Sequence, residues 1–363
     1  MPKAVKTKQI PVEKIISIKL AIRRAVFDST GKYIPVSFFS PDELVYENCQ
    51  PVMLEKTNSA FIAGKIKRQT DKGQKPPALF LVKGVGQFAA ADIKFASGGI
   101  LQNRIAIVTG AGSGLGKSIA IGLVRTGAIV GLFDIDEKAA KQASKKILEE
   151  LPDAQTMVIK CDVTDEKKVD KAYERIIEQW GGLDILVNAA GVAPAGPLVE
   201  MDVKKWRLAL EINLTGYFLM AKAAAKIMIK QGMGGSIINL SSKSGLAASK
   251  DNTAYNATKA GEIHIARGWA LELGQYGIRV NSVCPGNVFE GSKIWNPEYI
   301  KTCAKKYGIK PDEVIPFYLS QTALKKEITG RDVADSVVFL CSDNARTITG
   351  QCLVPDAGQV MVR

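Results

Sequence analysis

The segment that starts at Ile105 constrains the fold most, because it joins three parts in a fixed order. An apolar, β-branched run, Ile105 to Thr109, leads into Thr109-Gly110-Ala111-Gly112-Ser113-Gly114-Leu115-Gly116, and a stretch rich in alanine, isoleucine and leucine follows. This order predicts a strand, a tight turn and a helix. Glycines let the backbone approach a pyrophosphate, and the first helical turn offers free amides and a positive dipole end. We therefore predict a dinucleotide-binding loop with contacts from Gly110, Ser113, Gly114, Leu115 and Gly116.

From Gln102 onward, apolar runs alternate with longer amphipathic stretches. This alternation is typical of strand and helix units repeated around a parallel sheet. We predict an α/β fold with a doubly wound parallel sheet, the Rossmann fold, whose ligands bind beyond the carboxyl ends of the strands. The predicted strands are residues 105–109, 129–134, 156–161, 185–188, 236–241, 279–284 and 351–354.

The first ninety-nine residues have a different pattern, with short apolar runs and a basic stretch from Lys65 to Lys75 that ends at two prolines. We predict a linker or surface loop over the basic stretch, a strand at residues 78–82 and a turn at Gly84-Val85-Gly86. The chain is therefore divided into a small α+β extension, residues 1–99, and a Rossmann domain, residues 100–363.

Asp134 ends the second predicted strand of the Rossmann domain, where its carboxylate can accept hydrogen bonds from the hydroxyls of an adenosine ribose. A 2′-phosphate at that place would meet like charge, and neither the glycine loop nor Ile135 supplies a cation to hold it. The sequence therefore favours NAD over NADP. The next strands end at residues that would continue the lip of the same crevice, namely Asp162, Val163, Asn188, Ala189 and Gly191.

Tyr255 and Lys259 lie one turn apart in a predicted helix, so a phenol and an ammonium share one face. The ammonium favours the phenolate, which makes Tyr255 a candidate general base. Ser242 ends an apolar strand and could hydrogen-bond the reacting oxygen. Asn213 lies in a predicted amphipathic helix, Val203 to Lys230, where its side chain could hold a water against Lys259 in a proton relay. These four side chains are the candidate catalytic residues.

Taken together, these motifs resemble the short-chain dehydrogenase/reductase family. The resemblance rests on T-G-x-x-x-G-x-G at residues 109–116, on N-A-A-G at residues 188–191, and on Ser242, Tyr255 and Lys259, and it covers the chain from about residue 100 to its end. It implies a Ser, Tyr, Lys and Asn tetrad, hydride exchange with a nicotinamide, and a homo-oligomer, either a tetramer packed through the long helices or a dimer.

The family resemblance also implies cofactor contacts from Tyr255, Lys259, Pro285, Gly286 and Val288. One position departs from the family pattern, because the threonine that usually follows Pro285-Gly286 and touches the cofactor is replaced by Glu290. Ser292 is the nearest candidate to take its place. This departure bears on how the nicotinamide side of the site closes, and it leaves the predicted fold unchanged.

Two groups of segments narrow the substrate, and they point to different relatives within the family. Residues 242–245, 249–252, 307–314, 349–351 and 358–361 resemble sorbitol-6-phosphate 2-dehydrogenases. Residues 80–90, 262–267 and 291–295 resemble bifunctional rhamnulose-phosphate aldolase/lactaldehyde dehydrogenases. In such fusions the aldolase portion precedes the dehydrogenase and binds metal through several histidines, whereas this chain has one histidine, His264. We therefore predict no metal site, a structural role for His264, and an aldolase-like remnant of unknown role in residues 1–99.

Several lysines near the catalytic residues could meet a substrate phosphate. The predicted substrate contacts are Ser242, Lys243, Lys250, Tyr255, Asn287 and Lys293. The leading hypothesis is NAD-dependent interconversion of D-sorbitol 6-phosphate and D-fructose 6-phosphate. The alternatives are oxidation of lactaldehyde or of an unphosphorylated polyol and, from another class, an NAD-binding regulatory or assembly module without catalysis.

Composition bounds the partners and the compartment. The net charge is +13, but the first hundred residues hold sixteen lysines and arginines against eight acids, so we predict no nucleic-acid partner for the mildly basic remainder. The sequence has no run of eighteen apolar residues, so it predicts no membrane span. The six cysteines form no C-x-x-C pair, which indicates reduced thiols rather than a disulfide framework. We predict a cytoplasmic enzyme.

Overall fold

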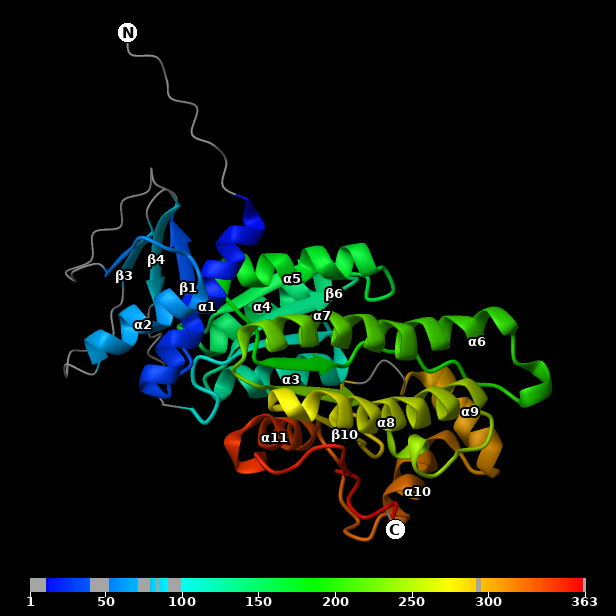
Figure 1. The fold of residues 1–363 in the computed structure, drawn as a ribbon. Coiled ribbons are helices and arrows are strands. Elements are labelled where there is room, and N and C mark those ends of the chain that lie inside the picture. The colour runs from blue at the N-terminus through cyan, green and yellow to red at the C-terminus, as the bar shows by residue number, and fades with distance from the viewer. Residues whose placement is uncertain are drawn as a thin grey trace. The chain divides into compact units, whose positions relative to one another are not determined.

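The computed structural model describes residues 11–39, 52–70, 79–82, 85–90, 99–291 and 295–361. The chain divides into two compact units, which are drawn in Figure 1. The smaller unit comprises residues 1–94, 174–182 and 230–233, and the larger unit comprises residues 95–173, 183–229 and 234–363. The division into domains at residue 99 stays a proposal.

The larger unit is built on a seven-stranded parallel sheet in the order β11-β10-β9-β8-β5-β6-β7. From β5, an inner strand, the chain first adds β6 and β7 on one side and then returns to add β8 to β11 on the other. The sheet is therefore doubly wound, and the predicted fold class is confirmed. The strands are β5 (Ile105–Thr109), β6 (Ile129–Asp134), β7 (Thr156–Lys160), β8 (Ile185–Asn188), β9 (Gly235–Leu240), β10 (Ile278–Val283) and β11 (Cys352–Leu353).

Helices cover both faces of this sheet, which explains why its strands appear in the sequence as continuous apolar runs. On one face, α3 (Gly114–Arg125), α4 (Glu137–Glu150) and α11 (Gly330–Cys341) pack against alternate strand residues such as Ala106 and Val108. The opposite face carries α5 (Glu166–Trp180), α7 (Gly216–Gln231) and α8 (Thr253–Leu273). Two shorter helices, α9 (Pro297–Tyr307) and α10 (Val314–Ser320), follow β10.

The strand predictions are confirmed for β5, β6 and β8, and the other strands differ at their ends. The structure ends β7, β9 and β10 one residue before Cys161, Ser241 and Cys284, and it limits β11 to two residues. At Ser241 the backbone amide bonds to Asn239 O as well as to Val283 O, so the chain is already turning out of the ladder. These departures fall where the chain leaves the sheet.

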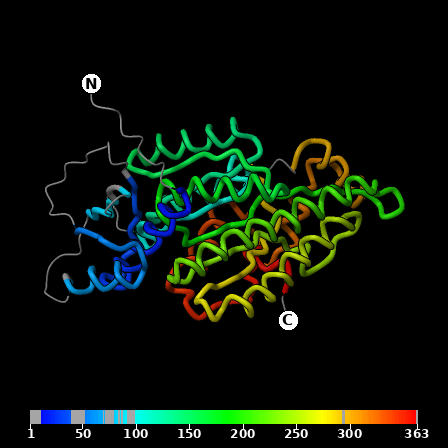
Figure 2. Tube along the Cα trace, turned by 45° about the horizontal axis from the view of Figure 1, so that its top comes forward, coloured from blue at the N-terminus to red at the C-terminus, as the bar shows by residue number. Residues whose placement is uncertain are grey.

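The predicted single helix from Val203 to Lys230 is wrong in one respect. It begins as α6 (Val203–Leu210), passes through one π-helical turn, Glu211–Thr215, and continues as α7. Figures 1 and 2 both show this interrupted helix running alongside α8. Asn213 lies within the π turn and is fully buried. Such turns are rare and often occur at functional sites, and amphipathic spacing does not predict them.

The smaller unit has a four-stranded sheet in the order β1-β4-β3-β2 with two helices. Its core includes Phe80 and Phe88 of the sheet, together with buried isoleucines of the helices. The predicted α+β class of the extension is therefore confirmed. The elements are α1 (Val12–Thr30), β1 (Val36–Phe39), β2 (Val52–Leu54), α2 (Ser59–Thr70), β3 (Leu79–Val82) and β4 (Gly86–Ala90).

The loop predicted from Lys65 to Lys75 is wrong for residues 65–70, which belong to α2. Ile62 and Ile66 lie one turn apart and are fully buried, while Lys67 and Arg68 lie on the exposed face. Residues 71–78 and 83–84 lie outside the described residues. Within the predicted turn, Val85 N donates to Val82 O at 3.0 Å, and β4 starts at Gly86.

Candidate active site

The crevice lies at the carboxyl ends of β5 and β8, where neighbouring strands lead the chain in opposite directions across the sheet. Thr109 joins the two strand ends, because its Oγ1 accepts hydrogen bonds from Ala189 N (2.9 Å) and Ala190 N (3.0 Å). The glycine loop after β5 and the Asn188-Ala189-Ala190-Gly191 loop after β8 are therefore fixed to each other. Both predicted cofactor segments meet at this edge.

The glycine loop needs its glycines for geometric reasons. Gly110 has φ +64°, and a Cβ there would lie 2.9 Å from Ala190 Cα. A Cβ on Gly116 would lie 2.3 Å from Gly110 O, so the first turn of α3 can pack on the loop only without a side chain. Ser113 is the N-cap of α3 and its side chain makes no cap hydrogen bond. The positive end of α3 is thus turned to the place where a pyrophosphate would bind.

Asp134 lies at the end of β6 and faces the glycine loop. Its Oδ2 accepts from Gly112 N (2.8 Å) and its Oδ1 accepts from Asp136 N (2.9 Å). The carboxylate is half-buried, so it retains access to solvent. A Cβ on Gly112 would lie 2.9 Å from Asp134 Oδ2, which explains why this loop position has no side chain. The predicted ribose-binding carboxylate and the loop therefore lie in direct contact.

The remaining residues of the predicted lip differ in how they are placed. Asp162 Oδ1 accepts from Thr164 N (3.1 Å) and Thr164 Oγ1 (2.7 Å), which shapes the turn after β7. Val163 is nearly buried, and a Cβ on Gly216 would lie 2.8 Å from its Cγ2. Asn188 is fully buried, and its Nδ2 donates to Asn239 Oδ1 at 3.1 Å. The Asn188 side chain therefore braces the sheet from inside, and the prediction that it faces a cofactor can apply only to its backbone.

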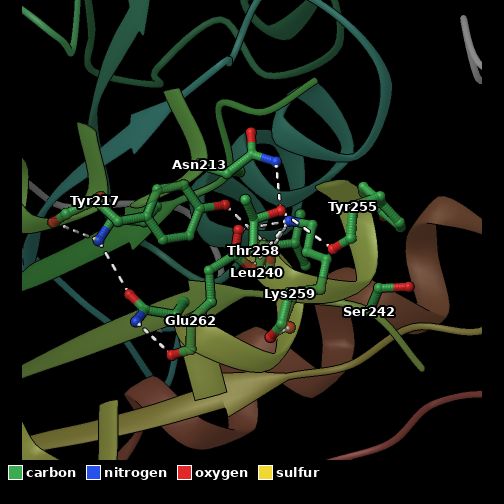
Figure 3. A network of polar contacts seen from close by, with 12 residues as sticks. Asn213, Tyr217, Leu240, Ser242, Tyr255, Thr258, Lys259 and Glu262 are labelled. Atoms are coloured by element: carbon green, nitrogen blue, oxygen red, sulfur yellow. Dashed lines mark hydrogen bonds and ion pairs between the residues drawn. The ribbon is translucent and has the colours of Figure 1, made fainter. Parts of the chain in front are cut away.

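Lys259 is held in place by several groups at the centre of the site (Figure 3). Its Nζ donates to Leu240 O (2.9 Å) and to the two carboxylate oxygens of Glu262 (2.9 and 3.0 Å). It also lies 5.6 Å from the ring centroids of both Tyr217 and Tyr255. Burial alone would lower the pKa of Lys259, but the Glu262 carboxylate and the two phenols outweigh burial and raise it.

Asn213 makes different bonds from those predicted. Its Nδ2 donates to Val192 O (2.9 Å) and Thr258 Oγ1 (3.0 Å), and its Oδ1 accepts from Val192 N (2.9 Å). It thus fixes the loop after β8 to α8. A Cβ on Gly191 would lie 3.3 Å from Asn213 Oδ1 and 3.8 Å from Lys259 Nζ. Asn213 Oδ1 and Lys259 Nζ therefore both lie beside the Gly191 backbone, and the predicted water relay stays a prediction.

Ser242 follows β9 and starts a short helical turn that packs against α8. Its Oγ accepts from Ser244 N at 3.1 Å, which leaves the hydroxyl hydrogen available to a ligand. The neighbouring Ser241 Oγ donates to Lys259 O at 2.7 Å, and a Cβ on Gly245 would lie 2.6 Å from the same oxygen. The serine turn is thereby held close to the half-buried Tyr255 helix (Figure 3).

Lys243 extends the site toward the end of the chain. Its backbone N donates to Pro285 O (3.0 Å), and its ammonium lies 5.6 Å from the ring centroid of Tyr318. Burial lowers the pKa of Lys243 to about 8; Asp356 opposes this change and the positive charge of Lys306 adds to it. Lys243 is thus a half-buried cation. Among the described residues, no carboxylate accepts a hydrogen bond from its ammonium.

A cluster of aromatic side chains from α9 and α10 lies beside Lys243. The ring centroids of Tyr307 and Tyr318 are 5.7 Å apart, and Lys306 Nζ lies 5.3 Å from the Tyr307 ring. Lys306 Nζ also donates to Lys250 O at 2.7 Å, which ties α9 to the loop before Tyr255. Lys243 and Lys306 therefore each lie over a ring of the same aromatic cluster.

The other predicted substrate contacts are less closely engaged. Lys250 is exposed and meets Lys306 through its backbone oxygen. Asn287 Nδ2 donates to Gln359 Oε1 at 3.4 Å, in the chain's last segment. Lys293 and Ser292 lie outside the described residues, and Glu290 is in the exposed turn that precedes them. His264 is exposed on α8, consistent with a role outside the site.

Sequence reasoning missed several residues of the site. Glu262 follows Lys259 at i+3 on α8, a spacing that could have identified it as a partner. Tyr217, Lys306, Tyr318 and Asp356 come from elements far from Tyr255 in sequence, and no local pattern marks them. Asp356 is nearly buried, and its Oδ1 and Oδ2 accept from Gly358 N (2.8 Å) and Val360 N (2.6 Å). Of these residues, Lys306 and Asp356 link later segments of the chain to the neighbourhood of Lys250 and Lys243.

Comparison with known proteins agrees with this geometry. The profile of the family described as enoyl-(acyl carrier protein) reductase matches residues 110–359. Sorbitol-6-phosphate 2-dehydrogenase of Escherichia coli is 34% identical over 72% of this chain and all of its own length. The crystal structure of sorbitol-6-phosphate 2-dehydrogenase from Erwinia amylovora superposes with a TM-score of 0.68 at 36% identity, covering 71% of this chain and all of that one. The uncharacterized oxidoreductase YuxG of Bacillus subtilis is 37% identical over 71% of this chain, which spans only 37% of YuxG.

The fold and the crevice define an oxidoreductase that uses a nicotinamide dinucleotide and acts on a small molecule. The chain belongs to the short-chain dehydrogenase/reductase family. The predicted class of enzyme is thereby confirmed, and the alternative of a module without catalysis is set aside. Among the residues that the structure describes, no helix has both the length and the apolar character needed to cross a membrane.

Proposed function

We propose that the enzyme interconverts a sugar-alcohol phosphate and its ketose phosphate, D-sorbitol 6-phosphate and D-fructose 6-phosphate, with NAD as the hydride acceptor. The observation that carries the proposal is the half-buried ammonium of Lys243, directly after Ser242 and beside the Tyr318 ring. A partly desolvated cation next to a reacting centre favours an anionic substrate, because charge-assisted hydrogen bonds to phosphate are strong. The similarity to sorbitol-6-phosphate 2-dehydrogenases supports the same substrate class.

The dinucleotide would lie along the carboxyl edge of β5, β6 and β8, with the ribose hydroxyls on Asp134 and the pyrophosphate at the start of α3. Asp134 disfavours a 2′-phosphate, which supports NAD over NADP. When bound, NAD supplies a nicotinamide ring that takes up hydride. The residues proposed to hold it are Gly110, Ser113, Gly114, Leu115, Gly116, Asp134, Asp162, Val163, the backbone of Asn188, Ala189, Gly191, Tyr255, Lys259, Pro285, Gly286 and Val288.

In the proposed reaction, the Tyr255 phenolate would take the hydroxyl proton of the substrate carbinol, and bound NAD would supply the hydride acceptor. Ser242 holds the reacting oxygen through its free hydroxyl hydrogen. Lys259 binds the nicotinamide ribose and stabilises the phenolate through its positive charge. Asn213 positions the Gly191 loop and, across the space beside Gly191, holds the water that carries the proton away.

Lys243, over the Tyr318 ring, and Lys306, over the Tyr307 ring, are proposed to receive the substrate phosphate together. Their mutual repulsion contributes to the lowered pKa of Lys243, and a phosphate dianion between them would relieve it. Lys250 would position Lys306 through its carbonyl rather than contact phosphate itself. In this proposal Lys306 contacts the phosphate in place of Lys250, which was the residue predicted from the sequence.

A substrate comparison tests this proposal. Replacing Lys243 with methionine should lower kcat/KM for D-sorbitol 6-phosphate by about 10-fold to 150-fold, the loss of roughly 1.5–3 kcal/mol for one hydrogen bond to a charged group. Activity on D-sorbitol should stay within about twofold of wild type. In the wild type, KM for the phosphate substrate should rise above about pH 8, because Lys243 loses its proton there, and Lys243→Met should lack this rise.

The matched control is Lys250→Met, which changes an exposed lysine of the same loop. It should change kcat/KM for either substrate by no more than about twofold. Equal wild-type activity on D-sorbitol and D-sorbitol 6-phosphate would contradict the phosphate anchor. Preference for lactaldehyde over both would favour the alternative function suggested by residues 80–90, 262–267 and 291–295.

We also propose a homo-oligomer, a tetramer or a dimer, located in the cytoplasm. Two exposed apolar residues support the oligomer, because Phe218 on α7 is 46% exposed and Leu271 on α8 is 86% exposed. Both residues lie on the long helices through which the family resemblance implies that copies pack. Residues 1–99 are proposed to be an aldolase-like remnant.

A further inference from the structure

Glu262 is a fully buried carboxylate that the proposed reaction does not use. It lies on α8 one turn beyond Lys259, and its two oxygens accept from Lys259 Nζ at 2.9 and 3.0 Å (Figure 3). Glu262 is 0% exposed and Lys259 is 5% exposed. The backbone oxygen of Glu262 accepts a hydrogen bond from Asn239 Nδ2 at 3.1 Å, so this turn of the helix is also fixed to β9.

Tyr255, Lys259 and Glu262 form a row along one face of α8, because they are spaced at i, i+4 and i+7. The ammonium therefore lies between the phenol and the carboxylate along the helix. Lys259 Nζ is 5.6 Å from the Tyr255 ring, and Glu262 lies one turn further away on the other side of the lysine. The Lys259 ammonium is therefore nearer to the Tyr255 phenol than the Glu262 carboxylate is.

The polar and titratable groups that surround this row come from four elements. Tyr217 on α7 and Tyr255 on α8 face Lys259, and Ser241 and Cys284, at the ends of β9 and β10, face Glu262. Burial by itself lowers the pKa of Lys259, and Glu262 is the largest influence that raises it. Burial also raises the pKa of Glu262, and the Lys259 ammonium opposes that change. Burial outweighs the ammonium and raises the pKa of Glu262 to about 7, so both members of the pair are charged on the alkaline side of neutrality.

Stability alone does not account for such a pair. Burying two charges costs desolvation free energy that their attraction only partly returns, and packed apolar side chains of similar size are often as stabilising or more so. A buried pair in contact with a general base therefore suggests a role in the reaction.

We propose that Glu262 is a positioning residue that keeps Lys259 charged and oriented beneath Tyr255. The inference rests on the proposed function, in which Lys259 stabilises the Tyr255 phenolate. Lys259 Nζ has three hydrogens, of which Leu240 O takes one and the carboxylate at least one. Without the carboxylate, burial is opposed only by the two phenols, and we expect Lys259 to give up its proton at a lower pH.

The test is the pH profile of kcat/KM for polyol oxidation in Glu262→Gln, which keeps the shape of the side chain and removes its charge. In the wild type, kcat/KM should not fall between pH 7 and pH 9. In Glu262→Gln it should fall about tenfold or more between pH 7 and pH 9, because the variant lacks the largest influence that raises the Lys259 pKa against burial. Glu262→Asp restores the charge and should return the shape of the wild-type profile, even where kcat is lower. Glu272→Gln, an exposed position on the same helix, serves as the matched control.

A direct measurement on the wild-type enzyme covers the case in which Glu262→Gln does not fold. In a nitrogen-15 NMR titration of labelled lysines, with Lys259→Met used for assignment, the Lys259 side-chain nitrogen should stay protonated through pH 10. Loss of its proton below that pH would overturn the inference, as would a Glu262→Gln profile that matches wild type. If Lys259→Met itself retains turnover, the proposed role of Lys259 fails instead, so the two failures are distinguishable.

Discussion

Replacing Tyr255 with phenylalanine should lower kcat by about 10²-fold to 10⁴-fold, the usual contribution of a positioned general acid or base. The substitution removes only the hydroxyl oxygen that would take the substrate proton. The crevice formed by Thr109, Gly110 and the loop after β8 does not depend on that oxygen. NAD should therefore bind within about threefold of its wild-type dissociation constant, measured by calorimetry, while steady-state turnover is lost.

Tyr276→Phe is a suitable control, since Tyr276 follows the same helix and is 44% exposed. It should leave both turnover and NAD binding unchanged. Turnover of Tyr255→Phe within tenfold of wild type would remove this residue from the proton transfer. A parallel loss of NAD binding would show instead that the phenol shapes the crevice.

Replacing Asp134 with alanine should change the cofactor preference more than any other single substitution in the crevice. Loss of hydrogen bonds from the ribose hydroxyls to a charged acceptor should lower kcat/KM for NAD by about 10-fold to 150-fold, or roughly 1.5–3 kcal/mol. NADP should improve, because the like charge that opposes its 2′-phosphate is gone. The ratio of kcat/KM for NAD to that for NADP should therefore fall by about 10²-fold to 10³-fold.

Asp134→Asn separates charge from shape in this experiment. It should lower the ratio by a smaller factor, since an amide can still accept one ribose hydrogen bond. Asp134 also accepts from Gly112 N and Asp136 N, so thermal unfolding of both variants must be compared with wild type. A wild-type enzyme that prefers NADP would contradict the account of this residue.

The sheet of the larger unit could be predicted from sequence because a strand buried on both faces needs an unbroken apolar run. The runs at Ile105 and Ile185 therefore match the observed strands residue for residue. The helix at residues 65–70 was missed because its exposed basic face dominates the pattern, while two isoleucines alone carry its buried face. The π turn around Asn213 depends on bonds to Val192 and Thr258, which no helical periodicity encodes.

The catalytic candidates could be predicted for a related reason, since Tyr255 and Lys259 lie on one helical face and Ser242 ends the strand beside it. Glu262 has the spacing of an ordinary solvent-exposed ion pair, and only burial distinguishes it. Lys306 and Tyr318 come to Lys243 through the packing of α9 and α10, which depends on tertiary contacts. Local pattern thus indicates residues on one element, and it does not indicate those that meet across elements.

Transfer of a deuterium label tests the central claim most directly. D-Sorbitol 6-phosphate labelled at carbon 2 should pass its deuterium to the nicotinamide ring when the enzyme and NAD are present, and NMR of the isolated NADH should show the label at ring carbon 4. Tyr255→Phe should slow this transfer without redirecting it. Appearance of the deuterium in water, or oxidation without labelled NADH, would contradict direct hydride exchange at this site.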